Sequence, residues 1–300
     1  MLRTAGIEVH PVLISTRDHG KIGTPNAYFQ RFDRTIGRVL IEKDTFFIDV
    51  ASFPHPIDLL PFEDLNGGGY EFWGKDNYAL VTLANKIPTR RMSQAIMSLN
   101  TEGSLFGTIA TTASGYEAVE NRKILKEVGA DKFAQSMVKG LLNSGKLEEQ
   151  KFEKPENFDE NNLKATLKIK SSDYVSVAGD KIYLNPLLCF GDKGSPFANP
   201  ERLYDVDYGS PKEDIANLVL TIPEGYKIEE LPKMTRLQFG EGAMKYDYLI
   251  EAAGNQIKVN TKLSIKKTIY EVENYKDLRD FYSKIIAKMG EQIVLTKVSK

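Results

Sequence analysis

Residues 2–20 read LRTAGIEVHPVLISTRDHG, and the architecture of the first part of the chain follows from them and from RTIGRVLIEKDTFFIDVAS at residues 34–52. Gly6 follows a short helical run, which is typical of the position just after the end of a helix. The apolar residues that come next predict a strand over 8–16. Two further strands, over 34–42 and 44–50, are joined tightly at Lys43-Asp44. This spacing predicts a β-hairpin.

The helix that ends at Gly6 has very little sequence in front of it. A first helix normally begins with a capping residue and two or three turns before its terminal glycine. Met1 to Arg3 leave no room for them. We therefore expect the natural protein to have a longer front than this chain, and we expect the chain itself to begin without a signal peptide.

Gly67-Gly68-Gly69 mark the expected boundary between two domains, which divides the chain into residues 1–66 and 67–300. Beyond the glycines, several segments alternate apolar and polar residues, as strands with one buried face do. Gly129 is expected to divide the first of the two helices. The elements expected in the second domain are strands at 78–85, 91–100 and 105–113, clean alternation from Ile257 to Ile265, and helices near 116–143 and 275–289.

These elements predict an α+β fold. The first domain contributes a partial sheet, and the second is expected to be an antiparallel β-sandwich-like module that carries two helices.

Composition excludes two classes of partner. Lysine and arginine number 40 and aspartate and glutamate 41, so the net charge is −1 and no basic stripe typical of nucleic-acid binding is visible. No apolar run approaches the ~20 residues that span a bilayer. The three histidines lack the spacing of a metal site, so we expect neither a metal nor a cofactor.

The first sixty residues resemble the second half of a transglutaminase-like core, which belongs to the papain-like cysteine protease superfamily. The resemblance rests on LRTAGI, on IDVA at 48–51 and on LLPFEDLNG at 59–67. The remainder, especially TIPEGYKIEELP at 221–232 and ENYKDLRDFYSKI at 273–285, resembles the β-rich C-terminal domain of unknown function that follows this core in large bacterial proteins.

The resemblance implies a catalytic triad of cysteine, histidine and aspartate. Asp49 matches the aspartate, but Arg34 stands at the position expected for the histidine. Arginine stays protonated near neutral pH and cannot act as a general base. The cysteine would precede Leu2, and the single cysteine, Cys189, lies far along the chain. We therefore expect no catalytic residues, and we expect Asp49 to pair with Arg34 across the hairpin.

Three residues are candidates for binding: His19, Asp49 and Trp73. His19 lies in the loop STRDHG, near the expected mouth of the former cleft, although a solvated turn explains it as well. Trp73 belongs to an aromatic cluster with Tyr70, Phe72 and Tyr78. Such a cluster either packs at the joint between domains or forms a platform for a sugar or a peptide.

The sequence thus favours a non-catalytic interaction or structural module from the bacterial cell envelope, reached through a signal peptide in a longer gene. One alternative is a fragment of a cysteine peptidase or acyltransferase whose nucleophile lies outside this chain. Another is a carbohydrate- or peptide-binding module. A protein or peptide partner fits all three. Because the helix that would cover the N-terminal sheet is missing, we expect this sheet to form a homo-oligomer or to fray.

Overall fold

The computed structural model describes residues 2–22, 29–51, 55–57, 59–85, 87–142, 145–153, 162–172, 174–187 and 194–298. The chain forms two compact units. The first consists mainly of Met1–Pro88, joined by Tyr208–Pro211, and the second contains the larger part of the chain from Thr89 onward.

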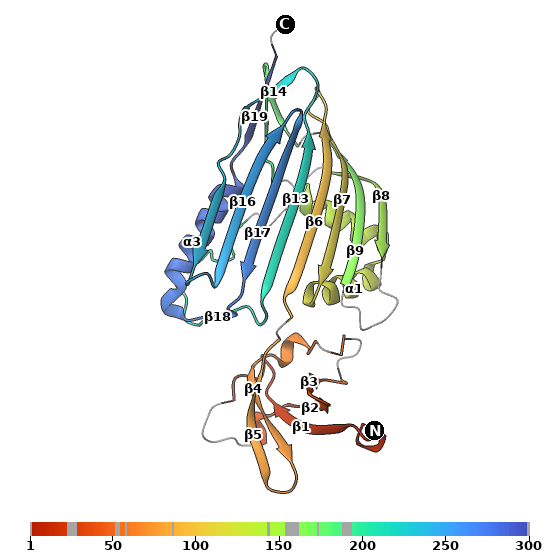
Figure 1. Cartoon of the computed structure of the whole chain (residues 1–300), viewed down its shortest axis with the longest axis vertical. Helices are drawn as coiled ribbons and strands as arrows, with labels where there is room; N and C mark the ends of the chain where they lie inside the picture. The colour runs from red at the N-terminus through yellow and green to blue at the C-terminus, as the bar shows by residue number, and fades with distance from the viewer. Residues whose placement is uncertain are drawn as a thin grey trace. The chain divides into compact units, whose positions relative to one another are not determined.

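The first unit is built on a five-stranded antiparallel sheet with the strand order β3-β2-β1-β4-β5 (Figure 1). The predicted hairpin forms, and the left-handed backbone of Gly6 (φ 77°) ends a short helical turn as expected. The elements of the unit are η1 (Arg3–Ala5), β1 (Glu8–Ile14), η2 (Phe29–Arg31), β2 (Arg34–Ile41), β3 (Asp44–Ile48), η3 (Phe62–Asp64), β4 (Gly67–Trp73) and β5 (Asn77–Leu83).

The boundary between the units lies later than the sequence indicated. The glycines at 67–69 do not mark a boundary but form the start of β4, which pairs with β1 through Gly69 opposite Ile14. A Cβ at position 69 would collide with the side chains of Val12 and Ile14, so the glycine permits the two strands to approach. The first unit therefore extends through β5 to Pro88, and the division at residue 66 is corrected.

An eight-stranded sheet forms the body of the second unit, with the strand order β15-β16-β17-β13-β6-β7-β9-β8 (Figure 1). Its strands are β6 (Thr89–Leu99), β7 (Leu105–Ser114), β8 (Lys146–Glu153), β9 (Asn162–Ser171), β13 (Lys212–Thr221), β15 (Thr235–Phe239), β16 (Met244–Ala253) and β17 (Gln256–Ile265). The alternation read from the sequence is confirmed, since Ile257 and Val259 are buried while Lys258 between them is exposed.

The large sheet is not purely antiparallel, which corrects one expectation. β6 and β13 lie side by side and run parallel, with Ala95 opposite Leu218. The other neighbouring pairs are antiparallel. Each half of the sheet is thus antiparallel within itself, and the first strands of the two halves meet at the centre. The long connection between β9 and β13 permits this parallel crossing.

Helices, rather than a second sheet of similar size, cover much of the buried face of the large sheet (Figure 1). Among the described residues there are three α-helices: α1 (Tyr116–Val128), α2 (Ala130–Leu141) and α3 (Tyr275–Met289). Gly129, with a left-handed φ of 83°, separates α1 from α2 as predicted. Phe133 of α2 and Leu125 of α1 share a buried cluster with Ala113 of β7. The expected two-helix sandwich is therefore a curved sheet with three helices.

Two small sheets complete the second unit. One has the order β10-β11-β19-β14 and the other pairs β12 with β18. Their strands are β10 (Ser176–Ala178), β11 (Lys181–Leu184), β12 (Val206–Asp207), β14 (Tyr226–Glu230), β18 (Ile269–Tyr270) and β19 (Ile293–Lys297), and η4 (Val272–Asn274) precedes α3. No helix within the described ranges has the length and apolar character needed to cross a membrane.

Candidate functional site

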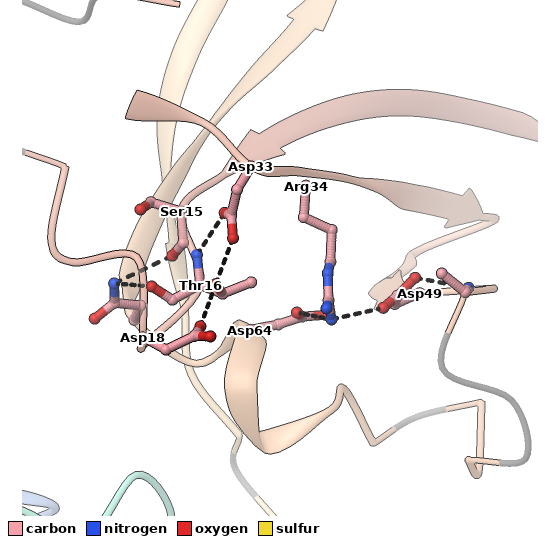
Figure 2. Close-up of polar contacts among 9 residues, drawn as sticks. Ser15, Thr16, Asp18, Asp33, Arg34, Asp49 and Asp64 are labelled. Atoms are coloured by element: carbon pink, nitrogen blue, oxygen red, sulfur yellow. Dashed lines mark hydrogen bonds and ion pairs between the residues drawn. The ribbon is translucent and has the colours of Figure 1, made fainter. Parts of the chain in front are cut away.

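Arg34 and Asp49, the two positions that the family resemblance singled out, contact each other at one end of the first sheet (Figure 2). Arg34 opens β2, and Asp49 follows directly after β3. Since Gly37 of β2 pairs with Ile48 of β3, the hairpin brings the two side chains to the same region. The Arg34 guanidinium lies 3.3 Å from Asp49 Oδ2. The ion pair expected across the hairpin is therefore present.

A third residue, Asp64, completes this cluster and was missed in the sequence analysis. The short helical turn η3 places its carboxylate 2.7 Å from the Arg34 guanidinium (Figure 2). The side chain of Asp64 is fully buried, and that of Asp49 is almost so. One arginine is thus held by two buried carboxylates. Asp64 lies within the quoted segment LLPFEDLNG, but nothing local distinguishes it from the neighbouring Glu63.

The surroundings of Asp64 change its protonation. Burial is the main cause that raises the pKa of Asp64 to about 6. The positive charge of Arg34 opposes this rise, and the nearby charge of Asp49 adds to it. Asp64 Oδ2 is buried and has no hydrogen-bond partner among the described residues. Although burial alone would lower it, the pKa of Arg34 is raised by Asp64 and Asp49. The arginine therefore stays protonated, while Asp64 titrates near neutral pH.

A second polar network fixes the loop after β1 beside this cluster (Figure 2). The backbone N–H of Thr16 donates to Asp33 Oδ1 at 2.8 Å, and the Thr16 hydroxyl lies 2.5 Å from Asp33 Oδ2 and 2.6 Å from Asp18. Although burial opposes it, these bonds lower the pKa of Asp33. Asn66 donates to the carbonyl oxygens of Ser15 and Thr16. The loop is therefore anchored by buried polar bonds.

His19 lies on this anchored loop and is exposed. Its Nδ1 is 3.1 Å from the hydroxyl of Ser15, and the same hydroxyl donates to the carbonyl oxygen of Gly20. These contacts tie His19 to its own turn. His19 remains a binding candidate on the rim of the network.

Trp73, the third candidate, stacks on His10 with ring centroids 6.1 Å apart. His10 Nδ1 lies 2.6 Å from Glu71, a buried carboxylate that also accepts a hydrogen bond from Arg38. Side chains alternate along β4, so Trp73 and Glu71 share one face of the sheet while Tyr70 and Phe72 lie on the other. The aromatic cluster of the sequence analysis is therefore divided between two faces.

The cluster of Arg34, Asp49 and Asp64 offers ion pairing with two buried carboxylates. A guanidinium cannot take up a proton at neutral pH, so Arg34 cannot serve as a general base. Within the part of the chain that the structure describes, no group of three or more His, Cys, Asp or Glu residues is placed to hold a metal ion. Cys189 lies outside the described residues.

Comparison with known proteins gives a family match and similarity to solved structures. A family model described as a domain of unknown function with a solved structure (DUF3858) matches residues 180–295, within the second unit. No curated protein sequence matches the chain. The crystal structure of a "putative protease" from Parabacteroides distasonis is similar, with 10% sequence identity and a TM-score of 0.50.

The structural similarity covers 99% of this chain and 41% of that protein. This chain therefore spans about two-fifths of the length of its structural relative. At such low identity the likeness shows a shared β-rich fold.

Proposed function

We propose that this chain is a non-catalytic interaction or structural module, derived from a transglutaminase-like protein of the bacterial cell envelope. One observation carries the proposal: Arg34 occupies the position that the family resemblance assigns to the catalytic histidine, and two buried carboxylates hold it there. A permanently protonated side chain at that position cannot accept the proton of a nucleophile.

The geometry also supports a structural role for the same residues. Arg34 begins β2, Asp49 follows directly after the neighbouring strand β3, and Asp64 lies on η3, which precedes β4. The ion cluster therefore ties η3 to the open end of the β2–β3 hairpin. Breaking a buried ion pair on one side leaves an uncompensated charge, which strongly destabilises a fold. A structural ion cluster thereby accounts for Arg34 and Asp49, the residues at two positions of the triad that the resemblance implies.

An assay of acyl transfer and of peptide hydrolysis tests the proposal. The chain is incubated with a fluorescent primary amine and a glutamine-containing peptide, before and after treatment with iodoacetamide. We expect no turnover above that of buffer. Turnover that iodoacetamide abolishes, and that is lost in both Cys189→Ser and Asp49→Asn, would overturn the proposal, because a thiol would then act together with the matching aspartate.

A fragment of a cysteine peptidase or acyltransferase is the second candidate. It is favoured by the fact that the similar structure is more than twice as long as this chain. The DNA upstream of the codon for Met1 distinguishes the two. A reading frame that encodes a cysteine-bearing helix and a signal peptide favours the second candidate, and the signal peptide would also support the envelope location.

A carbohydrate- or peptide-binding role is the third candidate, and a row of aromatic side chains favours it. Tyr78 of β5 contacts both Tyr70 and Phe72 of β4, with ring centroids 6.4 Å and 6.1 Å apart. A glycan and peptide array probed with the chain tests this role, with Tyr78→Ala as the variant. Trp73→Ala, on the opposite face, is the matched control. Binding that is lost only in Tyr78→Ala would support this candidate.

A further inference from the structure

β5 forms one edge of the five-stranded sheet. It pairs with β4 over its whole length, from Gly67 opposite Leu83 to Trp73 opposite Asn77, without a shift in register. No described segment pairs with its other side. The backbone N–H and C=O groups on that side form a regular row. Such a row is a template on which another strand can add.

This edge lacks the features with which proteins usually protect exposed strands. Its sequence NYALVTL contains no charged residue, no proline and no bulge. Two large side chains, Tyr78 and Leu80, are 64% and 57% exposed. Natural sheets protect their edges with charges, prolines, bulges or short strands. A neutral, regular seven-residue edge with exposed apolar side chains therefore indicates a partner.

The three other edges of the two largest sheets are protected in the expected ways. β8 contains Lys and Glu at five of its eight positions and has a register shift between Leu147 and Glu149. β15 is only five residues long and contains Arg236. β3 is equally short and begins with Asp44. Of the four edges, β5 is the unprotected one, and the protected edges offer positions for control substitutions on the same molecule.

The sequence of β5 is suited to pairing with itself. With Leu80 at a twofold axis, antiparallel pairing places Tyr78 opposite Thr82 and Ala79 opposite Val81. Leu80 meets its own copy, and no charged residue faces another. Tyr78, Leu80 and Thr82 alternate onto one face of the sheet. On that face the aromatic rows of two copies would meet along the junction, and cross-strand pairs of aromatic and apolar residues stabilise sheets.

We propose that β5 pairs in antiparallel fashion with β5 of a second copy of this chain, so that two five-stranded sheets join into one of ten strands. The interface is isologous, as in most symmetric dimers. It goes beyond the proposed function, because it stands whether or not the chain is catalytic.

Sedimentation velocity over a dilution series tests the association. We expect the wild-type chain to shift from monomer to dimer as its concentration rises. Leu80→Lys places two like charges opposite each other at the axis, and it should weaken dimerisation by about tenfold or more. Thr45→Lys, at an exposed position on the protected edge β3, should leave dimerisation unchanged. Circular dichroism verifies that both variants fold, as their exposed positions lead us to expect.

Disulfide trapping tests the register. In a Cys189→Ser background, Leu80→Cys should form an intermolecular disulfide under mild oxidation, because directly opposite residues in an antiparallel pair are about 4.5–5.5 Å apart at Cα. Ala79→Cys should not, because the two copies of residue 79 would lie about 8 Å apart.

Two results would overturn the proposal. One is a wild-type chain that remains monomeric over the whole dilution series, which would leave an extended peptide as the occupant of the edge. The other is a dimer that Leu80→Lys leaves intact and that Leu80→Cys does not trap, which would place the contact elsewhere on the molecule.

Discussion

Ionisation of Asp64 should make the stability of the first unit depend on pH, and Asp64→Asn should remove this dependence. The pKa of Asp64 is raised from its usual 3.8 to about 6 in the folded protein, chiefly by burial. The folded state therefore binds this proton more tightly than the unfolded chain does. The resulting stabilisation is fully present below about pH 4 and is lost as the pH rises through about 6.

The magnitude follows from the size of this change. One pKa unit corresponds to 1.36 kcal/mol, so a rise from 3.8 to about 6 corresponds to about 3 kcal/mol of stability lost between about pH 4 and pH 7. Asparagine mimics the protonated acid, because it is neutral and keeps an oxygen that can accept a hydrogen bond from Arg34. The free energy of unfolding of Asp64→Asn, relative to that of the wild type, should therefore rise by about 2–3 kcal/mol from about pH 4 to about pH 7.

Denaturant unfolding followed by tryptophan fluorescence measures this difference. Trp73 is the only tryptophan of the chain and lies on β4, so its emission reports on the first unit. Free energies of unfolding are compared at about pH 4 and about pH 7.5 for the wild type, for Asp64→Asn and for Asp44→Asn. Asp44 is exposed, so this control leaves the buried cluster unchanged. If the free energies of unfolding of the wild type and of Asp64→Asn differ by the same amount at both pH values, the reasoning is refuted.

Three further substitutions test the packing of the two units. Arg34→Met removes the cation between two buried carboxylates and should cost about 3–5 kcal/mol at neutral pH, with a smaller loss in acid, by the same fluorescence assay. Glu71→Ala leaves a histidine and an arginine without their buried carboxylate and should lower the free energy of unfolding by about 2–4 kcal/mol, measured as a lower midpoint of denaturation. Gly107→Ala should destabilise the second unit by more than about 3 kcal/mol in circular dichroism melts, because a Cβ there would collide with the carbonyl oxygen of Ile96. An unchanged melting temperature would contradict this last expectation.

The local elements of this protein were largely predictable from its sequence. Alternation of period two is a property of neighbouring residues, so the strand around Val259 and its buried face were identified without knowledge of the fold. Backbone conformations that favour glycine are also local, which explains why the ends of elements at Gly6 and Gly129 were found. The hairpin that joins Arg34 to Asp49 belongs to the same class, because tight turns fix their own register.

The arrangement of these elements was decided by tertiary structure alone. Gly69 was interpreted as part of a domain boundary because its role, the close approach of β4 to β1, depends on a strand more than fifty residues away. The parallel pairing of β6 with β13 joins strands that no local pattern connects. The role of Asp64 as the second partner of Arg34 is visible only in the folded structure, because η3 places it there. Burial at that position raises the pKa of its carboxyl group. Pairing, burial and protonation depend on which distant segments meet, and the order of residues along the chain does not fix those contacts by itself.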